Sequence, residues 1–202
     1  MSAMRNIVSS TAAALMVLSA IGPTPANSAS PMTVGSYTSQ PIGHYEFCRR
    51  TPSECRIRPM DYGPQRLTKK LWREMVRINV TVNSQIQPMN DYDIYGKDEV
   101  WAYPNGAGDC EDYVLEKRRQ LQALGVSLSN LLITVARKPD GEGHAILTVR
   151  TDRGDFVLDN LTDRVKPWEE TGYWYLKRQA SNHTGRWVTI DGFNNPFVGS
   201  VD

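Results

Sequence analysis

The stretch LLITVARKPDGEGHAILTVRTDRGDFVLD, residues 131–159, contains three short runs rich in β-branched residues, separated by two turn signals. The runs are Leu131–Arg137, His144–Arg150 and Asp155–Asp159, and the turns are Pro139-Asp140-Gly141 and Asp152-Arg153-Gly154. Runs of this kind joined by short Gly-containing turns predict neighbouring strands. Consecutive strands on tight turns form an antiparallel meander. A further strand is predicted over Arg186–Ile190.

Upstream of this meander the apolar residues follow a helical period. Residues 66–87 carry an apolar stripe at steps of three and four, made of Leu67, Leu71, Met75, Ile78, Val82 and Ile86. The stripe predicts a helix with one face in the core, ended by Pro88. A polar loop is expected over 89–108, and a second helix from Asp109 or Cys110 up to a Gly125 cap. Helices first and sheet second predict an α+β fold with N-terminal helices packed on an antiparallel sheet.

Composition and charge exclude several classes of protein. The chain has 202 residues and a formal net charge of +1, with 40% hydrophobic residues. This length fits one main domain with a core of its own. The near-neutral charge argues against a protein that binds nucleic acid through bulk electrostatics. No apolar run is long enough for a transmembrane helix, so no membrane-spanning segment is expected in the mature chain.

The N-terminus has the pattern of a secretory signal peptide. Arg5 supplies a positive charge, Thr11–Ile21 is a short apolar run, and small residues follow up to Ala29. We therefore expect residues 1–29 to be a signal peptide and the protein to be periplasmic or secreted. Residues 30–45 are rich in Pro, Ser, Thr and Gly and are expected to be a flexible lead-in.

The three cysteines divide into a close pair and a single residue. Cys48 and Cys55 are seven residues apart, with Pro52 and Ser53 favouring a turn between them. A disulfide, a metal pair and two free thiols are all compatible with this spacing. An exported protein favours the disulfide, because disulfides persist in oxidising compartments.

The third cysteine, Cys110, lies at the predicted start of a helix in the sequence Gly108-Asp109-Cys110-Glu111-Asp112-Tyr113. The helix dipole and the free N–H groups of a first turn favour a thiolate there. Asp109, Glu111 and Asp112 work against it, because nearby anions raise a thiol pKa. The conflict calls for a cation, either a basic side chain or a metal ion. On its own, an isolated cysteine such as Cys110 is more often a small buried apolar residue than a nucleophile.

Two polar residues in the meander are candidate partners of Cys110. His144 opens one predicted strand and Asp159 closes the next. In an antiparallel pair these positions lie at the same end of the sheet, opposite the 152–154 turn. A carboxylate that orients an imidazole, which in turn deprotonates a thiol, would complete a catalytic triad. The ordinary alternative is a polar strand edge followed by a turn.

These motifs together resemble the bacterial transglutaminase-like cysteine peptidases. The resemblance covers roughly residues 45–191 and rests on three segments: GDCEDY at 108–113, GHAILTV at 143–149 and VLDNL at 157–161. It implies the transglutaminase/papain-like cysteine peptidase fold over a domain at 46–202. It also implies a peptidase with Cys110 as nucleophile, His144 as base and Asp159 as orienting acid.

The same family includes periplasmic proteases that release large biofilm adhesins from the cell surface. By resemblance the protein substrate is such an adhesin, and a membrane receptor sequesters the protease. In those members the acids beside the nucleophile bind calcium, which activity requires. The matching positions are Asp109 and Glu111, with Asp112 as an addition, and carboxylate oxygens are suitable Ca²⁺ ligands.

Other interpretations remain open at this level. The same triad could pass the acyl group to an amine, as in a transglutaminase or amidase, or the chain could be a non-catalytic exported binding module. A separate calcium loop of the EF-hand type is suggested by Asp91-x-Asp93-x-x-Gly96, but it fails because Tyr95 and Ala102 occupy ligand positions.

Overall fold

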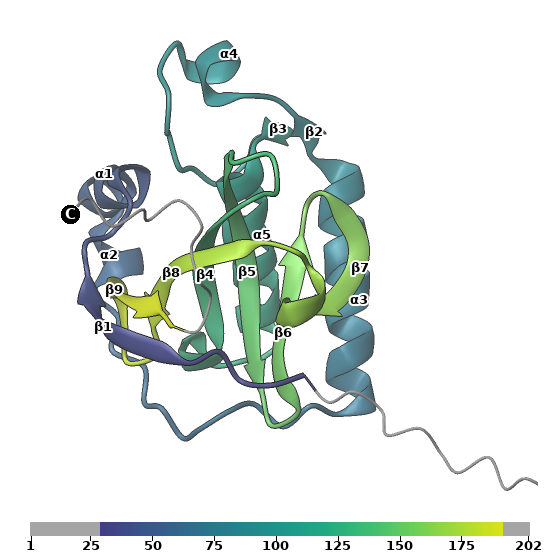
Figure 1. The fold of residues 1–202 in the computed structure, drawn as a ribbon. Helices are drawn as coiled ribbons and strands as arrows, with labels where there is room; N and C mark the ends of the chain where they lie inside the picture. The colour runs from purple at the N-terminus through teal and green to yellow at the C-terminus, as the bar shows by residue number, and fades with distance from the viewer. Residues whose placement is uncertain (1–28, 192–202) are drawn as a thin grey trace, which may run out of the picture.

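The structure, a computed structural model, describes residues 29–191 (Figure 1). The helices are α1 (Ile42–Arg50), α2 (Pro52–Cys55), α3 (Lys69–Gln85), α4 (Asp91–Tyr95) and α5 (Cys110–Ala123). The strands are β1 (Val34–Thr38), β2 (Gln87–Pro88), β3 (Ala107–Gly108), β4 (Leu131–Arg137), β5 (Gly143–Thr151), β6 (Gly154–Asp159), β7 (Thr162–Pro167), β8 (Trp174–Ala180) and β9 (His183–Ile190). Short 3₁₀ turns lie at Leu128–Asn130 and Trp168–Glu170.

Seven of these strands form one antiparallel sheet in the order β1-β9-β8-β4-β5-β6-β7. The expected meander is confirmed as β4, β5 and β6, and β7 extends it by one strand. The chain then crosses back, so that β8 pairs with the other edge of β4. The prediction of an α+β fold with an antiparallel sheet is therefore correct.

The expected lead-in over residues 30–45 is wrong for much of its length. β1 pairs with β9 in the register Val34↔Ile190 and Thr38↔Trp187, and α1 begins at Ile42. The side chains of β1 are mostly exposed, so its sequence lacks the apolar alternation by which a strand is predicted. Main-chain hydrogen bonds to β9 order the segment instead. The expected signal peptide up to residue 28 and the end of the expected domain, 192–202, lie outside the described residues.

Two long helices build the core against the sheet. α5 packs on β5, and α3 packs on both α5 and β7 (Figure 1). The predicted stripe of α3 is buried at Met75, Ile78 and Val82. The helix begins after Thr68, whose hydroxyl accepts a hydrogen bond from the Leu71 N–H, so it is shorter at both ends than the predicted 66–87.

The predicted loop over 89–108 contains the short helix α4, and its end is held by β3. β3 pairs in parallel with β2, in the register Gln87↔Ala107 and Pro88↔Gly108. This two-stranded ribbon brings the end of α3 next to the start of α5. No helix among residues 29–191 is long and apolar enough to cross a membrane.

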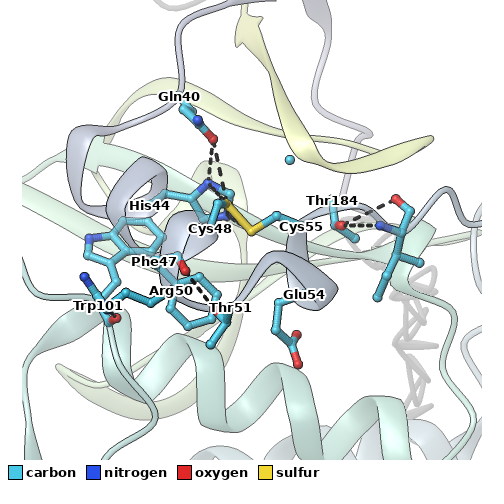
Figure 2. The surroundings of a disulfide bond; sticks show 12 residues. Gln40, His44, Phe47, Cys48, Arg50, Thr51, Glu54, Cys55, Trp101 and Thr184 are labelled. Atoms are coloured by element: carbon cyan, nitrogen blue, oxygen red, sulfur yellow. Dashed lines mark hydrogen bonds between the residues drawn. A yellow bond between two sulfur atoms is a disulfide. The ribbon is translucent and has the colours of Figure 1, made fainter.

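Cys48 and Cys55 form a disulfide that joins α1 to α2, as predicted. Figure 2 shows the buried His44 ring against it, with Nδ1 3.5 Å from Cys48 Sγ. The ring also makes an edge-on contact with Trp101, with centroids 5.3 Å apart. Since both sulfur atoms are taken up in the bond, the alternatives of a metal pair and of two free thiols do not apply.

Lys117 on α5 is an unusual member of the core. Its side chain is fully buried, and Nζ makes no hydrogen bond within the described part of the chain. The ammonium lies 5.7 Å from the centre of the Tyr113 ring. Burial lowers the pKa of Lys117 to about 7, although the charges of Asp159 and Asp163 oppose this shift.

We predict that Lys117→Met stabilises the fold in a pH-dependent way. The unfolded chain holds the lysine proton more tightly than the folded chain, so the cost of burying the ammonium is fully present below pH 7. It fades as the pH rises from about 7 towards the ordinary lysine pKa. The free energy of unfolding should rise by roughly 2 kcal/mol at pH 6, and by less at pH 9, in urea denaturation.

The matched control is Lys70→Met, which removes an exposed lysine from α3 and should change stability little at either pH. Destabilisation by Lys117→Met at both pH values would contradict the account of Lys117 as a costly buried charge.

Candidate active site

His144 and Asp159 meet at one edge of the sheet. β5 and β6 pair from Thr151↔Gly154 to Leu147↔Leu158, so both residues lie beyond the last pair, at the end opposite the turn. His144 Nε2 lies 2.8 Å from Asp159 Oδ1, and both side chains are buried. The sequence prediction that these residues are cross-strand partners is confirmed.

The Asp159 carboxylate is held from several sides. Oδ1 also accepts the Leu161 N–H at 3.0 Å, and Oδ2 accepts the Tyr173 hydroxyl at 2.6 Å. Burial alone would raise the pKa of Asp159, but these hydrogen bonds and the one from His144 hold it below its usual value. The carboxylate is therefore ionised and accepts the Nε2 proton of His144, which leaves Nδ1 for another partner.

Cys110 is the first residue of α5 and lies against β5. Its Sγ accepts the N–H of Ala145, the residue after His144, at 3.3 Å. The thiol donates to Glu111 Oε2 at 3.2 Å, and within the described chain no hydrogen bond joins it to the His144 ring. The structure thus brings the three predicted residues to one corner, with the thiol proton directed to Glu111. A hydrogen bond between a nucleophile and its base is often long without substrate and shortens when substrate binds.

The electrostatics of the thiol are unfavourable for a thiolate. Burial raises the pKa of Cys110 well above its ordinary value, and the negative charge of Glu111 adds to this shift. The Ala145 N–H acts in the opposite direction. The helix N-terminus therefore does not by itself produce a reactive thiolate, and the conflict between thiol and acids expected from the sequence is present.

A cluster of three carboxylates lies beside the thiol. One oxygen each from Asp91, Asp109 and Glu111 lies within 4.8 Å of the others. Burial and the charge of Asp109 raise the pKa of Glu111 to about 9, and burial raises that of Asp109. Asp91 Oδ1 and Asp109 Oδ1 are buried and make no hydrogen bond within residues 29–191. Unpaired, crowded carboxylate oxygens are the donor set expected for a hard cation such as Ca²⁺.

Asp91 was missed as a partner of Asp109 and Glu111 by sequence reasoning. Its only signal was the incomplete EF-hand pattern, which points to oxygen ligands within one loop. In the structure Asp91 opens α4, and it joins the two acids of α5 through the folding of the 89–108 segment. Tyr173 was also missed, because no spacing in the sequence connects it with Asp159.

Asp112, the third predicted metal ligand, lies outside this cluster. Its Oδ1 accepts the Ala102 N–H at 2.8 Å and fixes the segment that precedes β3. Its other oxygen faces Gly108, where a Cβ atom would come within 2.5 Å. Burial and the charges of Asp109 and Asp91 raise the pKa of Asp112 to about 7. The hydrogen bond from Ala102 supports a structural part for Asp112, while Oδ2 is buried and makes no hydrogen bond within the described residues.

Cys110 opens into a cleft of about 420 Å³. Its wall is formed by the β2–α4 connection, the start of α5 and the turn after β6: Pro88, Met89, Asn90, Asp93, Gly108, Asp109, Cys110 and Asn160. The lining includes polar side chains and backbone near Gly108. A peptide chain can therefore approach the sulfur from solvent.

Solved structures with a similar fold include forms of LapG from Legionella pneumophila. The calcium-bound form matches with a TM-score of 0.51 and 23% sequence identity, over 62% of this chain and 74% of that chain. The EGTA-treated form gives 0.50 and 23%, over 58% and 67%. At this identity the likeness establishes the fold. No curated protein matches the chain.

A protein family also matches most of the chain. Residues 34–195 fit the family described as bacterial transglutaminase-like cysteine proteinase BTLCP. The match spans the disulfide, the carboxylate cluster and the corner shared by Cys110, His144 and Asp159. The chain therefore belongs to the bacterial transglutaminase-like cysteine proteinases.

Proposed function

We propose that this cysteine peptidase hydrolyses a peptide bond through Cys110, His144 and Asp159. The observation that carries the proposal is the His144–Asp159 hydrogen bond of 2.8 Å, one residue from the N–H that contacts the Cys110 sulfur. It provides a thiol, an imidazole and an orienting carboxylate in the order that nucleophilic catalysis requires.

The chemistry follows from the atoms available. His144 Nδ1 takes the thiol proton, and Cys110 Sγ attacks the carbonyl carbon of the substrate. The same proton then passes to the leaving amine, the C–N bond breaks and a thioester remains. A water molecule, deprotonated by His144, hydrolyses the thioester and restores the thiol. Backbone N–H groups in the first turn of α5 lack intrahelical acceptors and are available to the developing oxyanion.

We propose further that Asp91, Asp109 and Glu111 hold a calcium ion. Their crowding, the raised pKa values of Asp109 and Glu111, and the two unpaired oxygens support this set. The ion would supply positive charge beside the thiol. Glu111 would then turn its carboxylate from Cys110 to the metal, which frees the thiol proton for His144. LapG has been solved in calcium-bound and EGTA-treated forms, which associates calcium with that relative.

The substrate and location proposed here follow the resemblance and the signal-peptide pattern. We infer an exported, periplasmic enzyme that cleaves a protein at the cell surface, with a large biofilm adhesin as its substrate and a membrane receptor that sequesters it. The open cleft at Cys110 suits an extended segment of such a protein. Transfer of the acyl group to an amine is the competing reaction of the same thioester.

We predict that Cys110→Ala abolishes cleavage while the fold is retained. Wild type, incubated with surface proteins extracted from the source cells, should produce new protein N-termini that mass spectrometry detects. The variant should produce none, because the thioester needs Sγ. Unchanged cleavage by Cys110→Ala, with circular dichroism equal to wild type, would reject Cys110 as the nucleophile.

The fate of the acyl group separates the two reactions. With an added primary amine such as glycine methyl ester, a peptidase should still release products with free carboxyl ends. Products that carry the mass of the amine in preference to water would instead indicate an acyltransferase. The mass of the fragment that carries the newly formed C-terminus distinguishes hydrolysis from transfer to the amine.

Calcium should bind to the carboxylate cluster and restore activity after chelation. We expect EGTA to stop cleavage and added Ca²⁺ to reverse this. Asp91→Asn should weaken calcium binding by at least about tenfold in calorimetry, because a buried anionic ligand is lost. Asp93→Asn is the matched control on α4, since Asp93 is exposed and outside the cluster.

Equal calcium affinity in wild type and Asp91→Asn would exclude Asp91 as a ligand. Full activity in EGTA would contradict the proposal that activity requires calcium, but not the proposal of the triad.

A further inference from the structure

We propose that Tyr173 is a positioning residue of this peptidase site, which fixes the Asp159 carboxylate against His144. The proposal rests on the triad proposed above. It assigns to Tyr173 no contact with the substrate and no proton transfer. Its action is to hold one carboxylate in the orientation that the imidazole needs.

A single side chain contacts both members of the pair. The Tyr173 hydroxyl donates to Asp159 Oδ2 at 2.6 Å, and its ring lies edge-on to the His144 ring, with centroids 5.4 Å apart at 75°. The hydroxyl thus restricts rotation of the Asp159 carboxylate, and the ring restricts movement of the His144 imidazole. Burial and the charge of Asp159 raise the pKa of Tyr173, so the phenol stays a donor throughout the neutral range.

The carboxylate needs this second restraint because its last torsion is soft. Terminal torsions of aspartate are broad, so the carboxylate of Asp159 can rotate about its own axis. His144 and Leu161 both donate to the same oxygen, Oδ1. Those two bonds hold one end of the group, and the bond from Tyr173 holds the other. With both oxygens engaged, the lone pairs of Oδ1 stay directed at His144 Nε2.

The backbone before β8 places Tyr173 where it can make this contact. Gly172 has a φ of +74°, a conformation that favours glycine, and the Tyr173 N–H donates to Thr171 Oγ1 at 3.3 Å. This turn follows the 3₁₀ segment Trp168–Glu170 and directs the ring across to the ends of β5 and β6. The position therefore depends on a distant part of the chain, not on β5 or β6 themselves.

Other charged groups face Asp159, and Tyr173→Phe leaves them in place. His144 comes from β5 and Lys117 from α5, whose ammonium interacts with the carboxylate. Arg164 and Lys166 of β7 line a cavity of about 20 Å³ together with Asp159 and Tyr173. Asp163, also of β7, accepts a hydrogen bond from Asn83 and interacts with Lys117.

The test is a double-mutant cycle with Tyr173→Phe and Asp159→Asn. Phenylalanine keeps the ring beside His144 and removes only the hydroxyl. The readout is the rate of Cys110 alkylation by iodoacetamide in calcium-containing buffer, because Cys110 is the single free cysteine and no substrate needs to be known. Tyr37→Phe on β1 is the control, as that exposed hydroxyl bonds to Asn182 in the β8–β9 connection.

At pH 7 we expect Tyr173→Phe to slow alkylation about tenfold, the effect of one hydrogen bond to a charged group. In the Asp159→Asn background the same change should have little further effect, because it acts through that carboxylate. A purely structural tyrosine would change unfolding free energy without this coupling.

The outcomes separate the two proposals. Equal rates for Tyr173→Phe and wild type, or an equal loss in the wild-type and Asp159→Asn backgrounds, would overturn the positioning role. An Asp159→Asn protein that reacts like wild type would overturn the triad itself, and with it the basis for Tyr173.

Discussion

The repulsion among the carboxylates at the start of α5 is the constraint on which the site depends. Asp91, Asp109 and Glu111 share one corner, in which Asp91 and Glu111 are buried and Asp109 is half-buried, and burial and their mutual charge raise the pKa values of Asp109 and Glu111. The same charge opposes ionisation of Cys110, whose proton is directed to Glu111. A helix dipole worth about 1 kcal/mol cannot offset such a cluster. A bound cation can, so metal binding and thiol activation are expected to be coupled.

The rest of the fold holds this corner from two directions. On one side, the ends of β5 and β6 present His144 and Asp159, and Tyr173, just before β8, donates a hydrogen bond to the Asp159 carboxylate. On the other side, the disulfide and His44 support Trp101, whose carbonyl accepts a hydrogen bond from Arg50 (Figure 2). The next residue, Ala102, is tied to Asp112 of α5. The covalent link between α1 and α2 thus contributes to the geometry beside Cys110.

Sequence reasoning succeeded where the information is local. The strands β4 to β6 could be predicted from β-branched runs between Gly-containing turns, and α3 could be predicted from its apolar stripe. His144 and Asp159 could be paired because tight turns fix which strand ends lie together. β1 and β8 were missed, since their order comes from pairing with strands distant in the sequence. Asp91 and Tyr173 were missed for the same reason. Asp112, predicted as a further ligand, lies outside the carboxylate cluster, because adjacency to Cys110 does not reveal which way a side chain on α5 points.

The most direct measurement of the coupling is the thiolate content of Cys110 with and without calcium. The ultraviolet difference spectrum between wild type and Cys110→Ala isolates this thiolate, because the other two cysteines are joined in the disulfide. At neutral pH we expect thiolate absorbance in the presence of calcium and its loss after chelation. Equal absorbance in both conditions would contradict the claim that a cation at the carboxylate cluster is what makes the thiol reactive.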